Sequence, residues 1–509
     1  SLARILRMNS FRHFPLGTRF PDSPHAVISS LPTMADVRGY EEKEPRVMQT
    51  LKSGYPRFVV HEFVRQLIDF YREREALAGR YALLVAGRRA ADDLLGWLGQ
   101  GFAKLEVDEA VFLVHCDASD VSRSHDLRKF VQHTGCGISS RQAEDLLLQH
   151  GLRAELFEED SYAGNASTKV EADLAALIGC RQADVLVCAS GMNAFYAGFR
   201  AVQEFQSGQG RTKWVQLGWL YLDSGKVLEQ FLDEGESLEC VYDVSDVDAV
   251  LERIRSCGDS LAAVVVECPS NPLIKVCDLK RIAAAVREQG GVMMVDPTIA
   301  SIYNVDVLPY ADLLVSSLTK YASIEGDIMV GALAVNPESP LYGDLVLRTS
   351  SFHVPSYRRD LARLALEMEA APGVIEKMNA NAAKLCAFLR AHPAVKEVHC
   401  ASGSERINDI SKDDRPVGAV VSIELAGDFE TFYDAIQLMK GPSFGTRYTL
   451  LCPFMYLAHY DLVTTPKGRE FLESIEIAPE LIRISVGEEP YEAIERVFAS
   501  ALQVAASRP

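Results

Sequence analysis

The stretch Leu313-Leu314-Val315-Ser316-Ser317-Leu318-Thr319-Lys320-Tyr321 ends an apolar, strand-like run with a lysine. A lysine amine is charged and strongly hydrated, so its place at the end of a buried strand needs a reason. One reason is chemical, because a desolvated amine can lose its proton and condense with a carbonyl group. The alternative is a strand-end lysine whose amine simply reaches solvent. The surrounding sequence has to decide between the two.

Composition narrows the class of protein. With 509 residues, 48% of them hydrophobic, the chain is long enough for two or three globular domains with a large core. Its 52 basic and 70 acidic residues give a net charge of -18, which disfavours nonspecific binding to nucleic acid or membranes. Its eleven cysteines show no close metal-ligand spacing, and no apolar run approaches the ~20 residues of a membrane helix. We therefore expect a cytoplasmic protein without a bound metal.

Three regions are predicted along the chain: 1–155, 156–350 and 351–509. The first has a Pro-rich opening and amphipathic helical stretches such as 59–75. Its residue pattern indicates no chemical function. The second alternates apolar runs with helical patterns, which is typical of a mostly parallel sheet covered on both faces. These runs occupy 184–188, 214–217, 263–267, 292–296 and 312–316.

The third region begins with a long helical pattern that ends at Leu389. Strand-like runs follow at 417–425 and 481–486. This order predicts a smaller α+β domain.

Asp296 follows four apolar residues at the end of the strand-like run that precedes the one ending near Lys320. A buried acid is costly unless it is paired. A protonated pyridine nitrogen is a suitable partner, since the ion pair keeps the ring electron-poor. The alternative is that Asp296 caps the next helix, which the following Pro297 supports. Together with Lys320, Asp296 favours a cofactor site.

Ser190-Gly191-Met192 forms a small-residue turn between a strand-like run and a helical pattern. Backbone N–H groups at the start of such a helix bind phosphate. Ser317 and Thr319 can add hydroxyl donors. An ordinary strand-to-helix turn is the alternative.

Three further side chains are candidates for cofactor or substrate contacts. Tyr221 can stack on a flat cofactor, although core packing is the ordinary role of an aromatic ring. Asn271, in a proline-flanked loop, can donate and accept hydrogen bonds near a phenolic oxygen, or it simply forms an Asn-Pro turn. Arg483 lies inside an apolar run and needs a carboxylate, either from an amino-acid substrate or from a structural salt bridge.

Five motifs in this order resemble the cystathionine γ-synthase family of transsulfuration enzymes: S-G-M-N-A at 190–194, E-C-P-S-N-P at 267–272, V-D-P-T at 295–298, S-L-T-K-Y at 317–321 and L-I-R-I-S-V-G at 481–487. The resemblance implies an α/β protein of pyridoxal phosphate (PLP) fold type I, which is aspartate-aminotransferase-like, with an N-terminal extension and a smaller C-terminal domain.

The resemblance also implies roles for individual residues. Lys320 would be the Schiff-base lysine and catalytic base, Asp296 the partner of the pyridinium, and Tyr221 a stacking and catalytic ring. Asn271 would lie near the cofactor oxygen and Arg483 would bind the substrate carboxylate. The implied phosphate contacts come from Ser190, Gly191, Met192, Ser317 and Thr319.

The N-terminal region resembles the long fungal-type members of the family. It carries L-P-T at 31–33, G-Y-E-E at 39–42, G-Y-P-R-F at 54–58 and Q-H-T-G at 132–135.

Two segments depart from the family pattern. The usual Y-S-R-x-x-N-P-T, which reaches the phosphate of a neighbouring subunit, appears from Tyr162 to Thr168 without its arginine. Tyr162 remains a cofactor candidate, and Arg141 is the candidate substitute for the arginine. Where many relatives have S-L-G-G-V-E-S, this chain has 443–449, with Arg447 and Tyr448 in place of a valine and an acid. We expect Ser443 and these two residues to contact substrate.

The resemblance implies a γ-replacement on an activated homoserine through a vinylglycine-type intermediate, with cysteine or another thiol as nucleophile. It also implies small amino-acid substrates and a homo-oligomer, a dimer or tetramer with shared sites. The main alternative is a natural-product enzyme that uses the same intermediate, for example from S-adenosylmethionine, for carbon-carbon bond formation or annulation. A β- or γ-lyase and a non-catalytic protein of the same fold are further alternatives.

Overall fold

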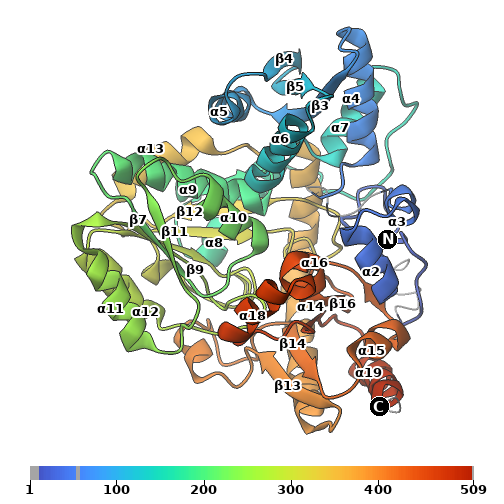
Figure 1. Ribbon diagram of the computed structural model, residues 1–509, viewed down its shortest axis with the longest axis vertical. Helices are drawn as coiled ribbons and strands as arrows, with labels where there is room; N and C mark the ends of the chain where they lie inside the picture. Colours follow the sequence, from blue (N-terminus) through green and yellow to red (C-terminus); the bar gives the residue numbers. More distant parts are fainter. Residues whose placement is uncertain (1–10, 53–54, 56–57, 507–509) are drawn as a thin grey trace.

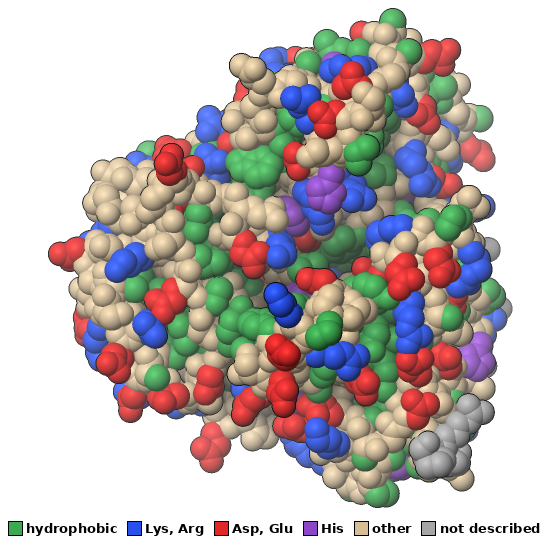
Figure 2. Space-filling model, in the orientation of Figure 1, with side chains coloured by type: hydrophobic (Ala, Val, Ile, Leu, Met, Phe, Trp, Pro, Cys, Tyr) green, Lys and Arg blue, Asp and Glu red, His purple; other side chains and the backbone are tan. Residues whose placement is uncertain are grey.

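The computed structural model describes residues 11–52, 55 and 58–506. Its described part contains a large seven-stranded sheet, a five-stranded sheet, a three-stranded sheet and a short two-stranded pair (Figure 1). Among these residues, no helix is long and apolar enough to cross a lipid bilayer. The face drawn in Figure 2 carries acidic and basic side chains close to one another over most of its area.

The large sheet is mostly parallel, as predicted. Its strand order is β6-β12-β11-β10-β9-β7-β8, and only β12 runs antiparallel to its neighbours. Parallel strands end at the same edge, so the residues that follow β9, β10 and β11 lie close together. The strands are β6 (Val185–Cys188), β7 (Lys213–Leu217), β8 (Ser237–Val241), β9 (Leu261–Glu267), β10 (Val292–Asp296), β11 (Leu313–Ser317) and β12 (Gly331–Val335).

Helices cover both faces of this sheet (Figure 1). The helix most important for the site is α9, which begins at Gly191 because Ser190 caps it: the Ser190 Oγ accepts a hydrogen bond from the Asn193 N–H at 3.0 Å. The helices are α8 (Ala166–Ile178), α9 (Gly191–Ser207), α10 (Leu222–Gln230), α11 (Val247–Cys257), α12 (Leu279–Glu288) and α13 (Tyr342–Phe352).

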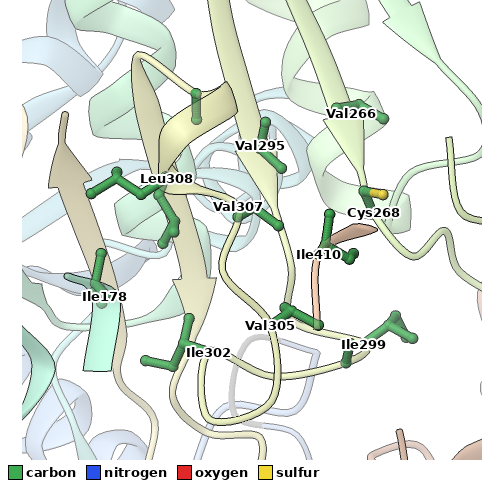
Figure 3. Packing of buried hydrophobic residues seen from close by; sticks show 14 of the residues in the cluster. Ile178, Val266, Cys268, Val295, Ile299, Ile302, Val305, Val307, Leu308 and Ile410 are labelled. Carbon is green, nitrogen blue, oxygen red and sulfur yellow. The ribbon is translucent and has the colours of Figure 1, made fainter. Parts of the chain in front are cut away.

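One apolar cluster joins the sheet to the loops below it (Figure 3). Val295 of β10 belongs to this cluster, as do Ile299 and Val305 from the loop that follows β10. Ile410, which lies between β13 (Val395–Cys400) and β14 (Val420–Leu425) of the smaller sheet, is also buried in the cluster, and the adjacent Ser411 forms a β-bridge with Val305. The cluster therefore fixes the end of β10 to the C-terminal part of the chain.

The C-terminal part is an α+β unit, as predicted. Its sheet has the order β13-β14-β17-β16-β15, and the 34-residue helix α14 connects it to the large sheet. Its strands are β13 (Val395–Cys400), β14 (Val420–Leu425), β15 (Met439–Lys440), β16 (Leu450–Pro453) and β17 (Ile482–Ser485). Its helices are α14 (Arg358–Ala391), α15 (Phe429–Ala435), α16 (Phe454–Ala458), α17 (Tyr460–Thr464), α18 (Pro466–Ser474) and α19 (Tyr491–Ala506).

The N-terminal region has two parts. A small antiparallel sheet, β3-β5-β4, packs with the helices around it at the top of Figure 1. The predicted helix at 59–75 is α4, which begins at Glu62 because the His61 imidazole caps it. The elements of this part are α4 (Glu62–Arg74), β3 (Arg80–Ala86), α5 (Arg88–Leu98), β4 (Ala103–Asp108), β5 (Val111–Asp117), α6 (Val121–Thr134) and α7 (Ser140–Gln149).

The segment before α4 lies against the smaller sheet. The buried Lys440 amine donates a hydrogen bond to the Pro32 carbonyl oxygen at 2.8 Å, and the Tyr433 hydroxyl donates to that of Leu31 at 2.7 Å. These bonds fix residues far apart in sequence beside one another. The elements of this segment are β1 (Arg19–Phe20), β2 (Ile28–Ser29), α2 (Met34–Glu41) and α3 (Pro45–Thr50).

Replacing Ile410 by alanine is expected to lower the free energy of unfolding by about 3 kcal/mol, because the packed cluster cannot fully collapse around the missing atoms. Ile410 is 3% exposed, whereas Leu347 on α13 is 71% exposed. The control Leu347→Ala is expected to change the same free energy by less than about 0.5 kcal/mol. Denaturant unfolding followed by circular dichroism measures both. Equal effects would contradict the packing in Figure 3.

Candidate functional site

A cavity of about 110 Å³ lies at the ends of β9, β10 and β11, beside the start of α9. It brings together most of the site residues predicted from the sequence. Those that line it are Gly191, Met192, Tyr221, Asn271, Asp296, Ser317, Lys320, Ser443 and Arg483. Among the described residues that line the same cavity, the sequence did not indicate Tyr55, Phe58, Glu267, Thr298, Phe444 and Phe454.

Lys320 is 8% exposed, and its amine faces aromatic groups. The Nζ atom donates a hydrogen bond to the Tyr55 hydroxyl at 3.0 Å, and it lies 4.5 Å from the centre of the Tyr55 ring. It also lies 5.4 Å from the centre of the Phe444 ring. The amine therefore points into the cavity rather than to bulk solvent, which excludes the alternative of an ordinary strand-end lysine.

Two buried carboxylates lie side by side at the end of the sheet. Asp296 and Glu267 are register partners on β10 and β9. Burial raises the pKa of Asp296 to about 6, and burial together with the Asp296 charge raises the pKa of Glu267 well above its usual range. Among the described residues, Asp296 has no ion-pair partner, and its Oδ1 atom accepts hydrogen bonds from the Thr298 backbone N–H and hydroxyl. One positive charge near these two carboxylates would stabilise their ionised forms.

The predicted phosphate contacts are only partly at the cavity. Gly191 approaches Ser317 so closely that an added Cβ atom would lie 2.7 Å from the Ser317 Cβ, so only glycine allows the start of α9 to lie here. The first N–H groups of a helix have no partner within the helix, and Gly191 and Met192, the first two residues of α9, both line the cavity.

Two predicted phosphate contacts face elsewhere. The Ser190 Oγ donates to the Gly135 carbonyl oxygen at 3.1 Å while it caps α9. The Thr319 Oγ1 accepts a hydrogen bond from the Val330 N–H at 3.1 Å. Neither side chain lines the cavity, since both hydroxyls stabilise the backbone that surrounds it.

Arg483 is a buried cation without a carboxylate partner among the described residues. Its Nη1 atom donates to the Asn271 Oδ1 at 3.1 Å, and its guanidinium carbon lies 4.9 Å and 4.7 Å from the ring centres of Phe444 and Phe454. The nearby Ser443 Oγ is also buried, with no hydrogen-bond partner in the described part of the chain. This arrangement favours a substrate carboxylate over the structural salt bridge that was the alternative.

Three of the predicted contacts lie outside the cavity of this chain. Tyr162 packs under the Lys169 amine, 5.7 Å from the ring centre. The Arg447 guanidinium pairs with Glu325 at 2.8 Å and with Glu488. The Tyr448 hydroxyl lies 3.1 Å from the carbonyl oxygens of both Phe20 and Glu325, so it contacts the N-terminal segment and the loop after β11. Arg447 and Tyr448 therefore do not line the substrate space, contrary to expectation, because their polar groups are used for packing.

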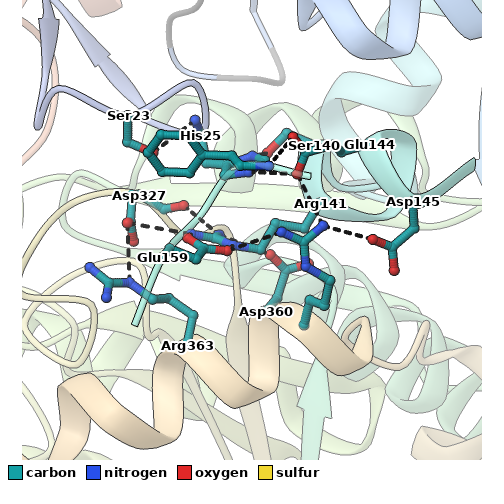
Figure 4. Close-up of polar contacts among 12 residues, drawn as sticks. Ser23, His25, Ser140, Arg141, Glu144, Asp145, Glu159, Asp327, Asp360 and Arg363 are labelled. Carbon is teal, nitrogen blue, oxygen red and sulfur yellow. Dashed lines mark hydrogen bonds and ion pairs between the residues drawn. The ribbon is translucent and has the colours of Figure 1, made fainter. Parts of the chain in front are cut away.

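Arg141 does not replace the missing phosphate-binding arginine. Its guanidinium is fully buried among the carboxylates of Glu159, Asp327 and Asp360, at 2.7, 3.4 and 3.1 Å (Figure 4). These charges hold its pKa above the usual range despite burial. Arg141 is the centre of a structural ion-pair network between α7 and α14.

The donor set of the cavity fits PLP. Lys320 can bind the aldehyde and Asp296 can pair with the ring nitrogen. Tyr221 can lie against the ring, while the start of α9 and Ser317 can hold the phosphate. A pyridinium would supply the positive charge that the two buried carboxylates lack.

Removing the Arg141 charge tests its structural role. Arg141→Gln is expected to lower the free energy of unfolding by about 3–5 kcal/mol, because buried carboxylates lose their partner. At temperatures where the variant is folded, its PLP content should equal that of the wild type. Arg415→Gln, which removes an exposed ion pair with Asp413, serves as the control and should leave the melting temperature unchanged. Loss of PLP from folded Arg141→Gln would restore the phosphate role.

The pKa of Asp296 predicts a pH dependence of PLP affinity. Because this pKa is raised to about 6, Asp296 gains a proton and loses its charge as the pH falls from 7.5 to 5. The attraction for a pyridinium is lost in the same range. Titration of cofactor-free protein with PLP, followed by fluorescence, should show wild type binding at least about tenfold tighter than Asp296→Asn at pH 7.5. The difference should shrink towards pH 5, and a constant ratio would contradict the assignment.

Comparisons with known proteins agree with this site. Residues 149–503 match the family model described as Cys/Met metabolism PLP-dependent enzyme. Over 487 residues the chain is 33% identical to an L-2-amino-4-chloropent-4-enoate dechlorinase/desaturase of Streptantibioticus cattleyicolor, covering 94% of this chain and 97% of that protein. It is 33% identical over 333 residues to a cystathionine gamma-synthase of Neurospora crassa, covering 64% of this chain and 52% of that protein.

A solved structure gives the same fold. The cystathionine gamma synthase from Xanthomonas oryzae pv. oryzae, in complex with aminoacrylate and cysteine, superposes with a TM-score of 0.58 at 21% identity. The superposition covers 70% of this chain and 92% of that one. The motifs, the cavity and the family match lead to one conclusion. The chain belongs to the Cys/Met metabolism PLP-dependent enzymes of the cystathionine γ-synthase type, with PLP fold type I.

Proposed function

We propose that the chain removes a leaving group from Cγ of an L-2-amino acid with a neutral, apolar side chain and creates a new unsaturation without adding a nucleophile. The observation that carries this proposal is the charge of the cavity wall. Among the described residues that line the cavity, Lys320 and Arg483 are the only cations. Arg483 binds the substrate carboxylate and Lys320 moves protons, so the carboxylate of a second amino acid would have no counterion.

The wall beyond Arg483 is apolar. Phe58, Phe444, Phe454, Leu457 and Ala458 all line the cavity. Such a wall accommodates a short hydrocarbon side chain and excludes water from the reacting atoms. A charged or strongly polar nucleophile would lose its hydration there with little compensation.

Each step of the proposed elimination then has a residue in this chain. Arg483 fixes the α-carboxylate with two N–H groups, and Asn271 fixes Arg483. Lys320 takes the proton from Cα and next the proton from Cβ. When bound, PLP stores the electrons that these proton removals release. The bond from Cγ to the leaving group breaks with its electron pair, and the electrons of the Cβ–H bond form the new π bond. Of the two protons that Lys320 has taken, one returns to Cα and the other goes to solvent, so the net loss is one proton and the leaving group.

Two relatives point to two different reactions. The relative from Streptantibioticus cattleyicolor is named for dechlorination and desaturation of a five-carbon amino acid, and it aligns over nearly the whole chain. The cystathionine gamma-synthase of Neurospora crassa aligns over 64% of this chain. The γ-replacement expected from the sequence is therefore the competing reaction, with cysteine as the nucleophile that distinguishes the two.

A product assay separates these reactions. The PLP-loaded protein is incubated with L-2-amino-4-chloropent-4-enoate, with and without cysteine, and chloride release and product mass are measured. One chloride per substrate consumed is expected, with a product lighter by the elements of HCl. Added cysteine should change neither the rate nor the product, because the described residues of the cavity offer no cation for a second carboxylate besides Lys320 and Arg483.

Other products would identify other reactions. A thioether that contains cysteine would show replacement, and ammonia with an oxoacid would show a lyase. Consumption of an activated homoserine but not of the chlorinated substrate would also contradict the proposal.

A further inference from the structure

The N-terminal region reaches the reacting amine of the site. Tyr55 lies between α3 and α4, 265 residues before Lys320, and its hydroxyl is 3.0 Å from the Lys320 Nζ atom. Phe58 of the same segment also lines the cavity. The family model begins only at residue 149, so neither residue belongs to the region that the model describes.

Tyr55 is held in place by a separate apolar cluster. Phe14, Phe20, Tyr448 and their neighbours form this cluster, and Tyr55 and Met329 pack against it. The Phe20 ring contacts the Tyr448 ring edge-on, with centres 4.2 Å apart. The Tyr55 carbonyl oxygen accepts the N–H groups of Phe58 and Val59, at 2.9 and 3.1 Å. Both the ring and the backbone of Tyr55 are therefore fixed.

We propose that Tyr55 is a catalytic residue of this site, whose hydroxyl holds the Lys320 amine whenever that amine is not linked to the cofactor. A lysine stem has four rotatable bonds, so a freed amine loses its orientation unless a group fixes it. The phenol and the ring face of Tyr55 together fix the amine inside the cavity. From this position the amine removes substrate protons. The inference deepens the proposed function, since it rests on proton removal by Lys320.

The test compares Tyr55→Phe with Tyr433→Phe. Both variants lose one hydroxyl, and the Tyr433 hydroxyl bonds the same N-terminal segment, at the Leu31 carbonyl oxygen, but does not line the cavity. In cofactor-free protein, labelling of Lys320 by an amine-reactive reagent is measured by peptide mass spectrometry. The hydrogen bond engages the amine, so Tyr55→Phe should label at least about threefold faster, and Tyr433→Phe at the wild-type rate.

A second measurement uses the PLP-loaded enzyme and an amino acid that has no leaving group. Exchange of the Cα proton of L-norvaline in D₂O, followed by NMR, should slow about tenfold or more in Tyr55→Phe and remain unchanged in Tyr433→Phe. Tyr55→His, which restores a hydrogen-bonding ring, should recover part of the rate and also serves if Tyr55→Phe does not fold.

The outcomes that overturn the proposal are distinct from those that overturn the elimination. Wild-type labelling and exchange in Tyr55→Phe would refute a catalytic Tyr55, and so would equal effects in Tyr433→Phe, which would show a general loosening of the segment. Absence of α-proton exchange in the wild type would refute both proposals, because both rest on proton removal by Lys320. Exchange of norvaline without chloride release from the chlorinated substrate would refute only the elimination.

Discussion

Two carboxylates buried at the ends of adjacent parallel strands are the constraint on which the rest of the site depends. Glu267 and Asp296 oppose each other in register, so each increases the cost of ionising the other. Glu267 is relieved by the Tyr221 N–H and by the nearby charge of Arg483, while Asp296 has the two donor groups of Thr298. A protonated ring nitrogen of bound PLP would supply the positive charge that balances them, and cofactor binding would then be part of the electrostatic balance of the fold.

The apolar wall of the cavity strengthens the electrostatic interactions of the two cationic side chains, Arg483 and Lys320. Arg483 lies between two phenylalanine rings, and the Lys320 amine lies near two aromatic rings, so water does not screen either group as it would at the surface. A carboxylate that enters this space meets one prepared partner. The proposed selectivity for a small substrate with a single carboxylate, and the proposed role of Lys320 as a base, both rest on this burial.

Sequence patterns predicted the large sheet and the residues that follow its strands, because parallel strands deliver their ends to one edge. Lys320, Asp296, Asn271 and Gly191 were placed at this edge in this way, and all four line the cavity. The patterns failed where a side chain is used far from its neighbours in sequence. Arg141 and Tyr448 carry groups suited to a ligand, yet each is used by a distant segment, and no spacing rule indicates such a pairing.

The sequence did not indicate Tyr55 as a site residue, for a different reason. It stands in a motif that was visible, but without periodicity or a strand end to say where its ring would point. The assignment of borders at 155 and 350 remains a prediction, and the contact between Tyr55 and Lys320 crosses the first of them.

The ring contact between Phe20 and Tyr448 links the 443–449 segment to the cavity. Tyr448 does not line the cavity itself, but it packs in the same cluster that holds Tyr55, which does. A substitution at Tyr448 would therefore act on the cavity wall indirectly, through the N-terminal segment. The strands that carry Asp296 and lead to Lys320 would stay in place.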